Sequence, residues 1–280
     1  MTEEIVKEYN IAVSRACKIV DLVRSQYYYS SKRDDSEVIE SLQDLAFKHP
    51  SYGFRKLFAY LRRSGKPWNH KRVHRLYQAL KLNKRRKGKR RLPDRVKQPL
   101  VQPAQVNDTW SVDFMSDSMV DNRKFRTAAA AAFNVIDDCS REALAIEQGR
   151  LAIDTSLSSK RITRVLERIG LSKGFPKAIR SDNGPEFTSK DFGIWCADRN
   201  IETRFIQPGK PTQNGFIERF NRLYREAVLD AYLFFDLDQV RQLTAEWIEE
   251  YNQRRPHEGL SNMTPFEWKD LLRKRKYNNK

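Results

Sequence analysis

The sequence is poor in cysteine and has no long apolar run, and these two absences exclude several classes of protein. Its 280 residues include only Cys17, Cys139 and Cys196, with no CxxC motif, which argues against a disulfide framework and a sulfur-rich zinc site. No run of about 18 apolar residues occurs, and no short apolar stretch follows a charged N-terminus. We therefore expect an intracellular protein with no membrane span and no secretory signal.

Acidic residues are nearly missing from one window of the chain. Residues 51–100 contain 18 Lys and Arg against a single Asp, and they account for the net charge of +17 because the other residues nearly balance. A positive field so concentrated predicts a polyanionic partner, most simply nucleic acid, although a solvated linker has the same composition. The hydrophobic fraction of 39% is enough for a core in at least one domain, and the length allows about two.

The first 80 residues are predicted to form a helical DNA-binding region of two modules. In the first, 1–30, Ser14 is expected to cap one of two short helices, an outline shared by helix-turn-helix units and by many other helical pairs. The second module, 36–80, has the apolar spacing and breaks of three helices. We expect these helices over 36–47, 53–63 and 70–80, the last with Asn69 as its N-cap.

The third of these helices combines a buried stripe with a basic face. Val73, Leu76 and Tyr77 repeat at helical spacing, and the opposite face is polar and basic. The residues of that face are His70, Lys71, Arg72 and Arg75. Such a helix is expected to lie in a major groove of DNA, the alternative being a solvated basic helix. His70 and His74 have no third ligand nearby, so a metal role for them is disfavoured.

A basic linker is predicted over 81–105. Ten of the seventeen residues from Lys81 to Lys97 are Lys or Arg, and glycine and prolines interrupt any helix. The candidate phosphate-binding residues in it are Lys84, Arg85, Arg86 and Lys87. The linker is expected to separate the helical region from a core at 106–235, followed by a helical C-terminal extension at 236–280.

Beyond the linker, strands and helices alternate. Strands are predicted at 110–115, 125–136, 143–148, 177–181 and 202–206, and helices at 154–169, 188–199, 214–232 and 237–254. This order is typical of a ribonuclease H-like α/β core, a mixed five-stranded sheet with flanking helices. Ala128–Ala132 fits poorly in a strand, because alanine is a weak strand former and an odd insertion inverts the register unless it is bulged or looped out.

Three acids stand out by their placement: Asp113 within a strand, Asp182 at the end of another, and Glu218 in the first turn of a helix. Breaking a phosphodiester needs charge stabilisation on the attacking and leaving oxygens, and Mg²⁺ ions held by carboxylates supply it. Structural roles are the alternative, since Glu218 has an i,i+4 partner in Arg222 and strand aspartates often cap turns. The acidic pair at 137–138 is interpreted as a turn. Glu186 is interpreted as the acid most easily mistaken for a catalytic residue.

Motifs around these acids resemble the DDE transposase and retroviral-type integrase family. The matching segments are TWSVDFM at 109–115, SDNGPEF at 181–187, QPGKPTQNGFIERFN at 207–221, YNQRRPHEGL at 251–260 and TP at 264–265. The last three are similar to bacterial insertion-sequence transposases of the IS-three type. HPSYG at 49–53 and WNHKRV at 68–73 resemble the helical DNA-binding region that precedes the core in that family.

The resemblance implies a site and a chemistry. Asp113, Asp182 and Glu218 are then the catalytic residues and the ligands of two Mg²⁺ ions, with Mn²⁺ as a substitute. In a metal-dependent step water cuts the element end, and the freed 3′-OH attacks a second phosphodiester by strand transfer. Around Glu218 we expect an exposed polar face that contacts DNA and an opposite buried face. The residues assigned to DNA contact in this region are Lys210, Asn214, Arg222 and Arg225, with Asn221 on the same face; Ile217, Phe220, Tyr224 and Val228 are expected to be buried.

The resemblance also implies partners. These are DNA, as element ends and target, further copies of the chain on that DNA, and a product of an upstream reading frame with a helix-turn-helix and a coiled coil. No sustained heptads occur, so the chain resembles the downstream portion alone, and a cytoplasmic, nucleoid-associated location in bacteria is expected. Two alternatives remain, a metal nuclease of the same fold and a catalytically dead DNA-binding remnant.

Overall fold

The computed structural model of the chain describes residues 2–29, 34–83, 100–115, 117–118, 124–125, 133–144, 159–207 and 211–278. It contains two compact units, Met1–Leu45 and Ala46–Lys280, and each is described by itself. Within the ranges given, no helix is long and apolar enough to cross a membrane.

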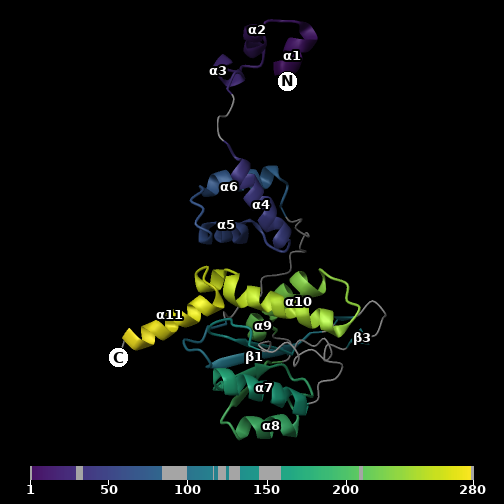
Figure 1. Cartoon of the computed structure of the whole chain (residues 1–280), viewed down its shortest axis with the longest axis vertical. Helices are drawn as coiled ribbons and strands as arrows, with labels where there is room; N and C mark the ends of the chain where they lie inside the picture. Colours follow the sequence, from purple (N-terminus) through teal and green to yellow (C-terminus); the bar gives the residue numbers. More distant parts are fainter. Residues whose placement is uncertain are drawn as a thin grey trace. The chain divides into compact units, whose positions relative to one another are not determined.

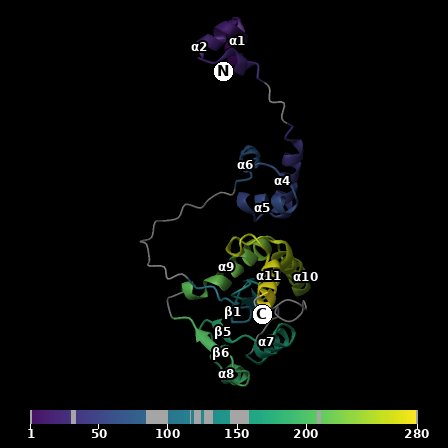
Figure 2. The same ribbon diagram turned by 90° about the vertical axis from the view of Figure 1, so that its left-hand side faces the viewer.

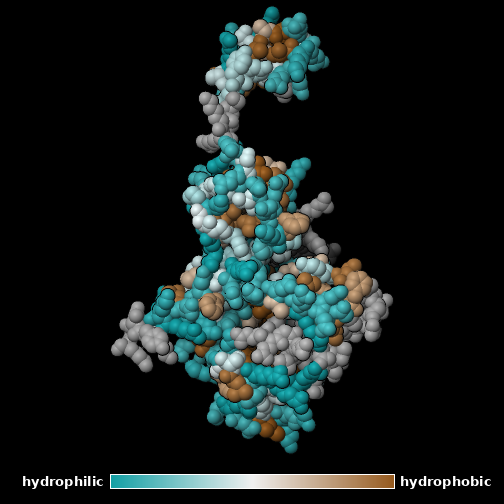
Figure 3. Space-filling model, viewed as in Figure 1, coloured by the Kyte–Doolittle hydropathy of each residue, from teal (hydrophilic) through white to brown (hydrophobic). Residues whose placement is uncertain are grey.

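The first unit is built from short helices. It contains α1 (Thr2–Tyr9), α2 (Val13–Ile19), α3 (Arg24–Tyr27) and most of α4 (Ser36–Lys48). The prediction that Ser14 caps a helix is wrong, because Ala12 holds the N-cap position and Ser14 lies inside α2. The chain turns at Asn10, whose φ is 46°, and α2 already begins at Val13, one residue before Ser14. Figure 3 shows apolar side chains gathered on the surface of this unit. Among its apolar residues, Ile19 is 63% and Val23 62% exposed.

The second unit begins with two helices, α5 (Phe54–Arg63) and α6 (His70–Ala79), at the predicted positions. Asn69 caps α6, since its side-chain oxygen accepts a hydrogen bond from the Lys71 backbone N–H at 2.8 Å. The apolar stripes of both helices are buried: Leu57, Leu61, Val73, Leu76 and Tyr77. The cap and the stripe of α6 therefore confirm the expected helix and leave its basic face toward solvent.

A mixed four-stranded sheet forms the centre of the second unit (Figure 1). Its order is β4–β1–β5–β6, with β1 (Thr109–Phe114) antiparallel to β4 (Phe133–Asp137) and parallel to β5 (Ala178–Ser181), which is parallel to β6 (Glu202–Phe205). Figure 2 shows the strands β1, β5 and β6 following one another between α9 and α8. The mixed sheet of a ribonuclease H-like core is thus present.

The strands predicted before the first crossover differ from those observed. Of the predicted strand 125–136, Phe125 belongs to β3 (Lys124–Phe125), which pairs with β2 (Asp117–Ser118) in a separate ribbon, and β4 is described from Phe133 onward. The predicted strand 125–136 contains residues of two strands that pair with different partners. The alternation of apolar residues along the sequence does not reveal the pairing partner. Ala128–Ala132 and residues 145–148 lie outside the described residues. At the start of the predicted third strand, Ala143 forms an isolated antiparallel bridge with Ile136.

Helices cover both faces of the sheet. The helices α7 (Ser159–Lys173) and α8 (Lys190–Ala197) lie on one face, and α9 (Gly215–Tyr224), α10 (Leu237–Glu249) and α11 (Pro265–Asn278) on the other (Figure 1). Alternate residues of β1 serve the two faces, because side chains of a strand point to opposite sides. Trp110 and Val112 pack with α7 and α8 in the main apolar core, whereas Ser111 and Asp113 face the other way.

The two long C-terminal helices confirm their predicted positions, but each ends in a widened π-helical segment. α9 continues as η2 (Arg225–Leu229), and α10 continues as η3 (Glu250–Arg254). Ser189 caps α8 as expected, accepting from the Phe192 N–H at 3.3 Å. A 3₁₀ turn, η1 (Pro211–Asn214), leads into α9, and a second, η4 (Glu258–Leu260), precedes α11.

Candidate active site

Two of the candidate acids lie at the carboxyl ends of neighbouring parallel strands. Asp113 is the fifth residue of β1, and Asp182 directly follows β5. The register pairs Ser111 with Arg180, so its continuation by two residues brings Asp113 level with Asp182. The carboxyl ends of parallel strands are where α/β sheets open their sites. The β1–β5 pairing therefore brings these two carboxylates to one edge.

The third acid, Glu218, is on α9, which packs over β1 and β4. Ile217, Phe220, Tyr224 and Val228 are buried, as predicted from the helical spacing. Glu218 lies in the first turn and is exposed. Burial of its neighbours fixes the rotation of α9 about its own axis and so fixes the side on which Glu218 stands.

The three carboxylates interact electrostatically. Burial, together with the charges of Asp182 and Glu218, raises the pKa of Asp113 to about 6, against hydrogen bonds from Phe114 and Asn221. Burial also raises the pKa of Glu218, while the charge of Arg222 opposes that shift. In the part of the chain that the structure describes, no group of three or more His, Cys, Asp or Glu side chains is placed to hold a metal ion. The triad is therefore a repulsive cluster and not a formed coordination shell.

Two side-chain amides, of Asn221 and Asn134, form a hydrogen-bonded chain that holds Asp113. The sequence did not assign these amides to the catalytic site. The Asn221 Nδ2 group donates to Asp113 Oδ2 at 2.7 Å, and Asn134 Nδ2 donates to Asn221 Oδ1 at 2.6 Å. Asn134 is the register partner of Asp113 on β4, and Asn134 Oδ1 has no hydrogen-bond partner among the described residues. The i+3 spacing of Asn221 from Glu218 was the one available signal, because that spacing puts both near one face of α9.

The loop after β5 holds Asp182 by local hydrogen bonds. The Gly184 N–H donates to Asp182 Oδ1 at 3.1 Å, and the Asn183 side chain donates to the Ile206 carbonyl at 3.1 Å. A Cβ added at Gly184 would stand 3.1 Å from both Asp182 Oδ1 and Glu186 Oε2, so glycine leaves room for two carboxylates. Glu186 therefore lies close to Asp182 in the same loop, and its exclusion from the triad stays a prediction.

The acid pair at 137–138 forms a structural turn, as interpreted from the sequence. Asp137 accepts from the backbone N–H of Ser140 at 2.6 Å and of Asn107 at 2.7 Å. Asp138 is fully buried, 2.5 Å from Arg180 Nη1, and accepts from the Ser111 hydroxyl. These partners account for both carboxylates as structural groups below the candidate site.

The residues expected to contact DNA fall into three groups by position. On α6, His70, Lys71 and Arg75 are exposed and Arg72 is half-buried. Near Glu218, Arg222 is exposed, and Arg225 Nη1 lies 3.9 Å from Asp230 Oδ1. The remaining basic candidates, Lys84, Arg85, Arg86, Lys87 and Lys210, lie outside the described residues.

The expected polar face of α9 needs a correction. Asn214 is only 3% exposed and Asn221 9% exposed, so they do not share an open face with Glu218 and Arg222. Asn214 ends η1 and precedes α9, so it does not follow the helical rotation assumed for it, while Asn221 is turned inward toward Asp113. The prediction that Asn214 is exposed for contact with DNA is therefore wrong.

Comparison with known proteins identifies related domains. The description "Integrase core domain" matches residues 103–211 and 199–265, and "HTH-like domain" matches residues 32–90. The 31.7 kDa protein of insertion element IS407 from Burkholderia multivorans (strain ATCC 17616 / 249) is 36% identical over 266 residues, covering 94% of this chain and 92% of the relative.

Two further similarities extend this result. The transposase InsD for insertion element IS2D of Escherichia coli (strain K12) is 26% identical over 270 residues, covering 92% of this chain and 88% of the relative. A chain of the simian T-cell lymphotropic virus intasome, solved with PP2A regulatory subunit B56 gamma, superposes with a TM-score of 0.51 at 16% identity. That match covers 82% of this chain and 74% of the other, and it supports the fold alone.

Proposed function

Because the chain belongs to the insertion-sequence transposases, with a helix-turn-helix-like region ahead of an integrase core, we propose that it cuts the ends of its element and joins them to target DNA. The observation that carries the proposal is the electrostatic coupling of Asp113 with Asp182 and Glu218 at the edge of β1 and β5. Three carboxylates concentrated beside a helix that bears arginines suit phosphoryl chemistry, which depends on positioning and charge stabilisation.

The donor set fits a divalent cation of the magnesium type. All three side chains offer only carboxylate oxygens, the ligands preferred by Mg²⁺ and accepted by Mn²⁺. Burial and mutual repulsion make the ionised triad unfavourable by itself, so positive charge at this edge would stabilise it. Bound there, two Mg²⁺ ions held by Asp113, Asp182 and Glu218 would supply charge stabilisation for the attacking and leaving oxygens.

The chain's own residues position the reactants. Asn221 holds the carboxylate of Asp113 in place through a 2.7 Å hydrogen bond. Arg222 stands one helical turn from Glu218, where its guanidinium would bind a DNA phosphate next to the cut. DNA contact by His70, Lys71, Arg72 and Arg75 on α6, by Lys84, Arg85, Arg86 and Lys87, and by Lys210 and Arg225 is part of the same proposal.

The assembly and the domain limits are also part of the proposal. We infer that copies of the chain pair two element ends on DNA, as strand transfer at both ends requires. A helical region at 1–80, a linker at 81–105, a core at 106–235 and an extension at 236–280 would then divide binding from catalysis. The matched ranges, an HTH-like domain at 32–90 and an integrase core from 103, support this division.

The test is a strand-transfer assay with labelled element-end duplexes and a target plasmid, with Mg²⁺, with Mn²⁺ and with EDTA. We expect joined products with either metal and none with EDTA. Hydrolysis without joined products would assign the chain to the metal nucleases, and DNA binding without either reaction would identify a catalytically dead remnant. Calorimetric titration of Mg²⁺ provides a readout apart from activity, with binding expected to be lost in the Asp182→Asn variant.

A further inference from the structure

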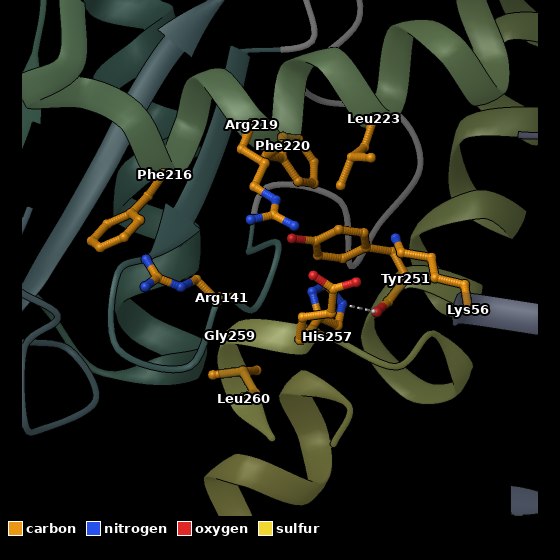
Figure 4. A pocket seen from close by; sticks show the side chains of 11 residues that line it. Lys56, Arg141, Phe216, Arg219, Phe220, Leu223, Tyr251, His257, Gly259 and Leu260 are labelled. Carbon is orange, nitrogen blue, oxygen red and sulfur yellow. Dashed lines mark hydrogen bonds between the residues drawn. The ribbon is translucent and has the colours of Figure 1, made fainter. Parts of the chain in front are cut away.

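A small cavity of about 100 Å³ lies between α5, α9 and the segment from η3 to η4 (Figure 4). Three cationic side chains line it, each from a different part of the second unit: Lys56 from α5, Arg141 from the turn after β4, and Arg219 from α9. Glu258 is the single carboxylate among the described residues that line it. The cavity is therefore basic, and no function described above uses it.

Arg141 lines this cavity without a complete set of hydrogen-bond acceptors. Its guanidinium lies over the ring of Phe216, 3.2 Å from the centroid, as Figure 4 shows. Its Nη1 atom is buried and has no hydrogen-bond partner in the described part of the chain. A buried charged donor without an acceptor is costly, so an anion that accepts from Nη1 would be stabilised.

Two further polar groups of the cavity wall, His257 and Tyr251, are neutral at pH 7. Burial lowers the pKa of His257 to about 3, with Arg255, Lys56 and Arg219 adding to the shift. Burial raises the pKa of Tyr251 to about 12, although Arg255, Arg141 and Arg219 oppose the shift. Both groups thus lie in the field of the same cations, and the Arg219 guanidinium points toward the Tyr251 hydroxyl (Figure 4).

We propose that this cavity binds one phosphodiester group of the DNA substrate, with Lys56, Arg141 and Arg219 as donors. The inference rests on the proposed function. A volume of about 100 Å³ is enough for a single tetrahedral oxyanion. Arg219 directly follows Glu218 on α9, and Lys56 belongs to the helix-turn-helix-like region. A strand held here would contact both that region and α9.

The experiment compares single variants in binding to a fluorescein-labelled element-end duplex over a series of salt concentrations. Arg219→Gln and Lys56→Gln are each expected to weaken binding about tenfold and to reduce the salt slope by about 0.9, the value for one lost phosphate contact. Glu258→Gln is expected to tighten binding, because it removes the carboxylate that competes for the same cations. Arg168→Gln, an exposed cation on α7, is the matched control for net charge and is expected to bind as the native chain does.

The sign of the Glu258→Gln effect separates a phosphate site from a structural one. Weaker binding in all three cavity variants, or binding equal to that of Arg168→Gln, would overturn the proposal. A duplex series with single neutral methylphosphonates adds a second readout. At one position, the methylphosphonate should weaken binding of the duplex to the native chain. The same duplex should bind Arg219→Gln no more weakly than the unmodified duplex does.

Two further comparisons distinguish DNA phosphate from free phosphate, and failure of the cavity site from failure of the proposed function. Inorganic phosphate at constant ionic strength should change the melting temperature of the native chain no more than it changes the melting temperature of Arg219→Gln. A rise confined to the native chain, with equal duplex binding by both, would assign the cavity to free phosphate and overturn the proposal. Native protein that neither binds nor joins duplexes would contradict the proposed function, whereas an active native protein with unaffected cavity variants would contradict the cavity site alone.

Discussion

At the residue scale, Asp113 shows how the fold holds a carboxylate in a form that is unfavourable for stability. Its Oδ1 atom accepts from the Phe114 N–H and its Oδ2 atom from Asn221, yet burial and the charges of Asp182 and Glu218 still raise its pKa to about 6. The carboxyl has a pKa near 3.8 when unfolded, so the ionised folded form is disfavoured at neutral pH. This cost is consistent with a group selected for metal binding.

The Asp113→Asn substitution is therefore expected to stabilise the metal-free protein. Folded Asp113 keeps its proton up to about pH 6 while the unfolded chain loses it near pH 4, so stability falls across this window and the cost persists above it. We expect a gain of up to about 3 kcal/mol at pH 7.5 that disappears toward pH 4. The amides of Asn221 and Asn134 can turn together to accept the new N–H₂ group, because Asn134 Oδ1 has no partner among the described residues.

Thermal melts in EDTA at several pH values check this prediction. Asp191→Asn, an exposed carboxylate in the first turn of α8, is the matched control and should show no such pH-dependent gain. A destabilised Asp113→Asn protein at pH 7.5 would show that the raised pKa of Asp113 is not the dominant effect.

At the element scale, most of the fold was predictable because its signals are local. The apolar spacing and caps placed α5, α6, α8, α9 and α10 close to their observed limits, and β5 and β6 stand between turn residues. The pairing of strands is not local, and the separation of β3 from β4 followed from their different partners. The π-helical ends η2 and η3 depend on tertiary packing, so no pattern in the sequence indicated them. For the inward turn of Asn221, the i+3 spacing from Glu218 was the one signal available.

The cap of α6 gives a test at this scale. Asn69→Ala removes the acceptor of the Lys71 N–H and is expected to cost about 1 kcal/mol in unfolding free energy. Asn69→Asp keeps the acceptor and should retain stability, but its negative charge beside Lys71 should weaken DNA binding. Urea denaturation and duplex titration measure the two effects. Equal DNA binding by Asn69→Asp and the native chain would argue against phosphate contact at the start of α6.

At the scale of the whole molecule, α5 is tied to the C-terminal helices by polar contacts around Glu250, the first residue of η3. The Tyr60 hydroxyl donates to Glu250 Oε1, and the Tyr52 hydroxyl lies 3.4 Å from the same atom. Arg255 is only 2% exposed and lies over the ring of Tyr52, 4.6 Å from its centroid. The hydrogen bonds of Glu250 and the contact of Arg255 with the Tyr52 ring link the helical region to the core within the second unit.

Tyr60→Phe tests this link. Loss of one hydrogen bond to a charged acceptor is expected to cost about 2 kcal/mol and to raise amide exchange in α5 and η3 together. Tyr232→Phe, with a half-exposed ring in the loop after η2, serves as the control and should change neither quantity. Faster exchange in α5 alone would show that the contact does not couple the two segments.

The central claim is that Asp113, Asp182 and Glu218 act together in metal-dependent strand transfer. The most direct measurement is the yield of joined element ends in Mg²⁺ for Asp113→Asn, Asp182→Asn and Glu218→Gln, with duplex binding measured in parallel and Glu186→Gln as the matched control. We expect each triad variant to lose about a thousandfold or more in joining rate and to keep its DNA binding, while Glu186→Gln still joins ends. Near-normal joining by any one of the three variants would contradict the account.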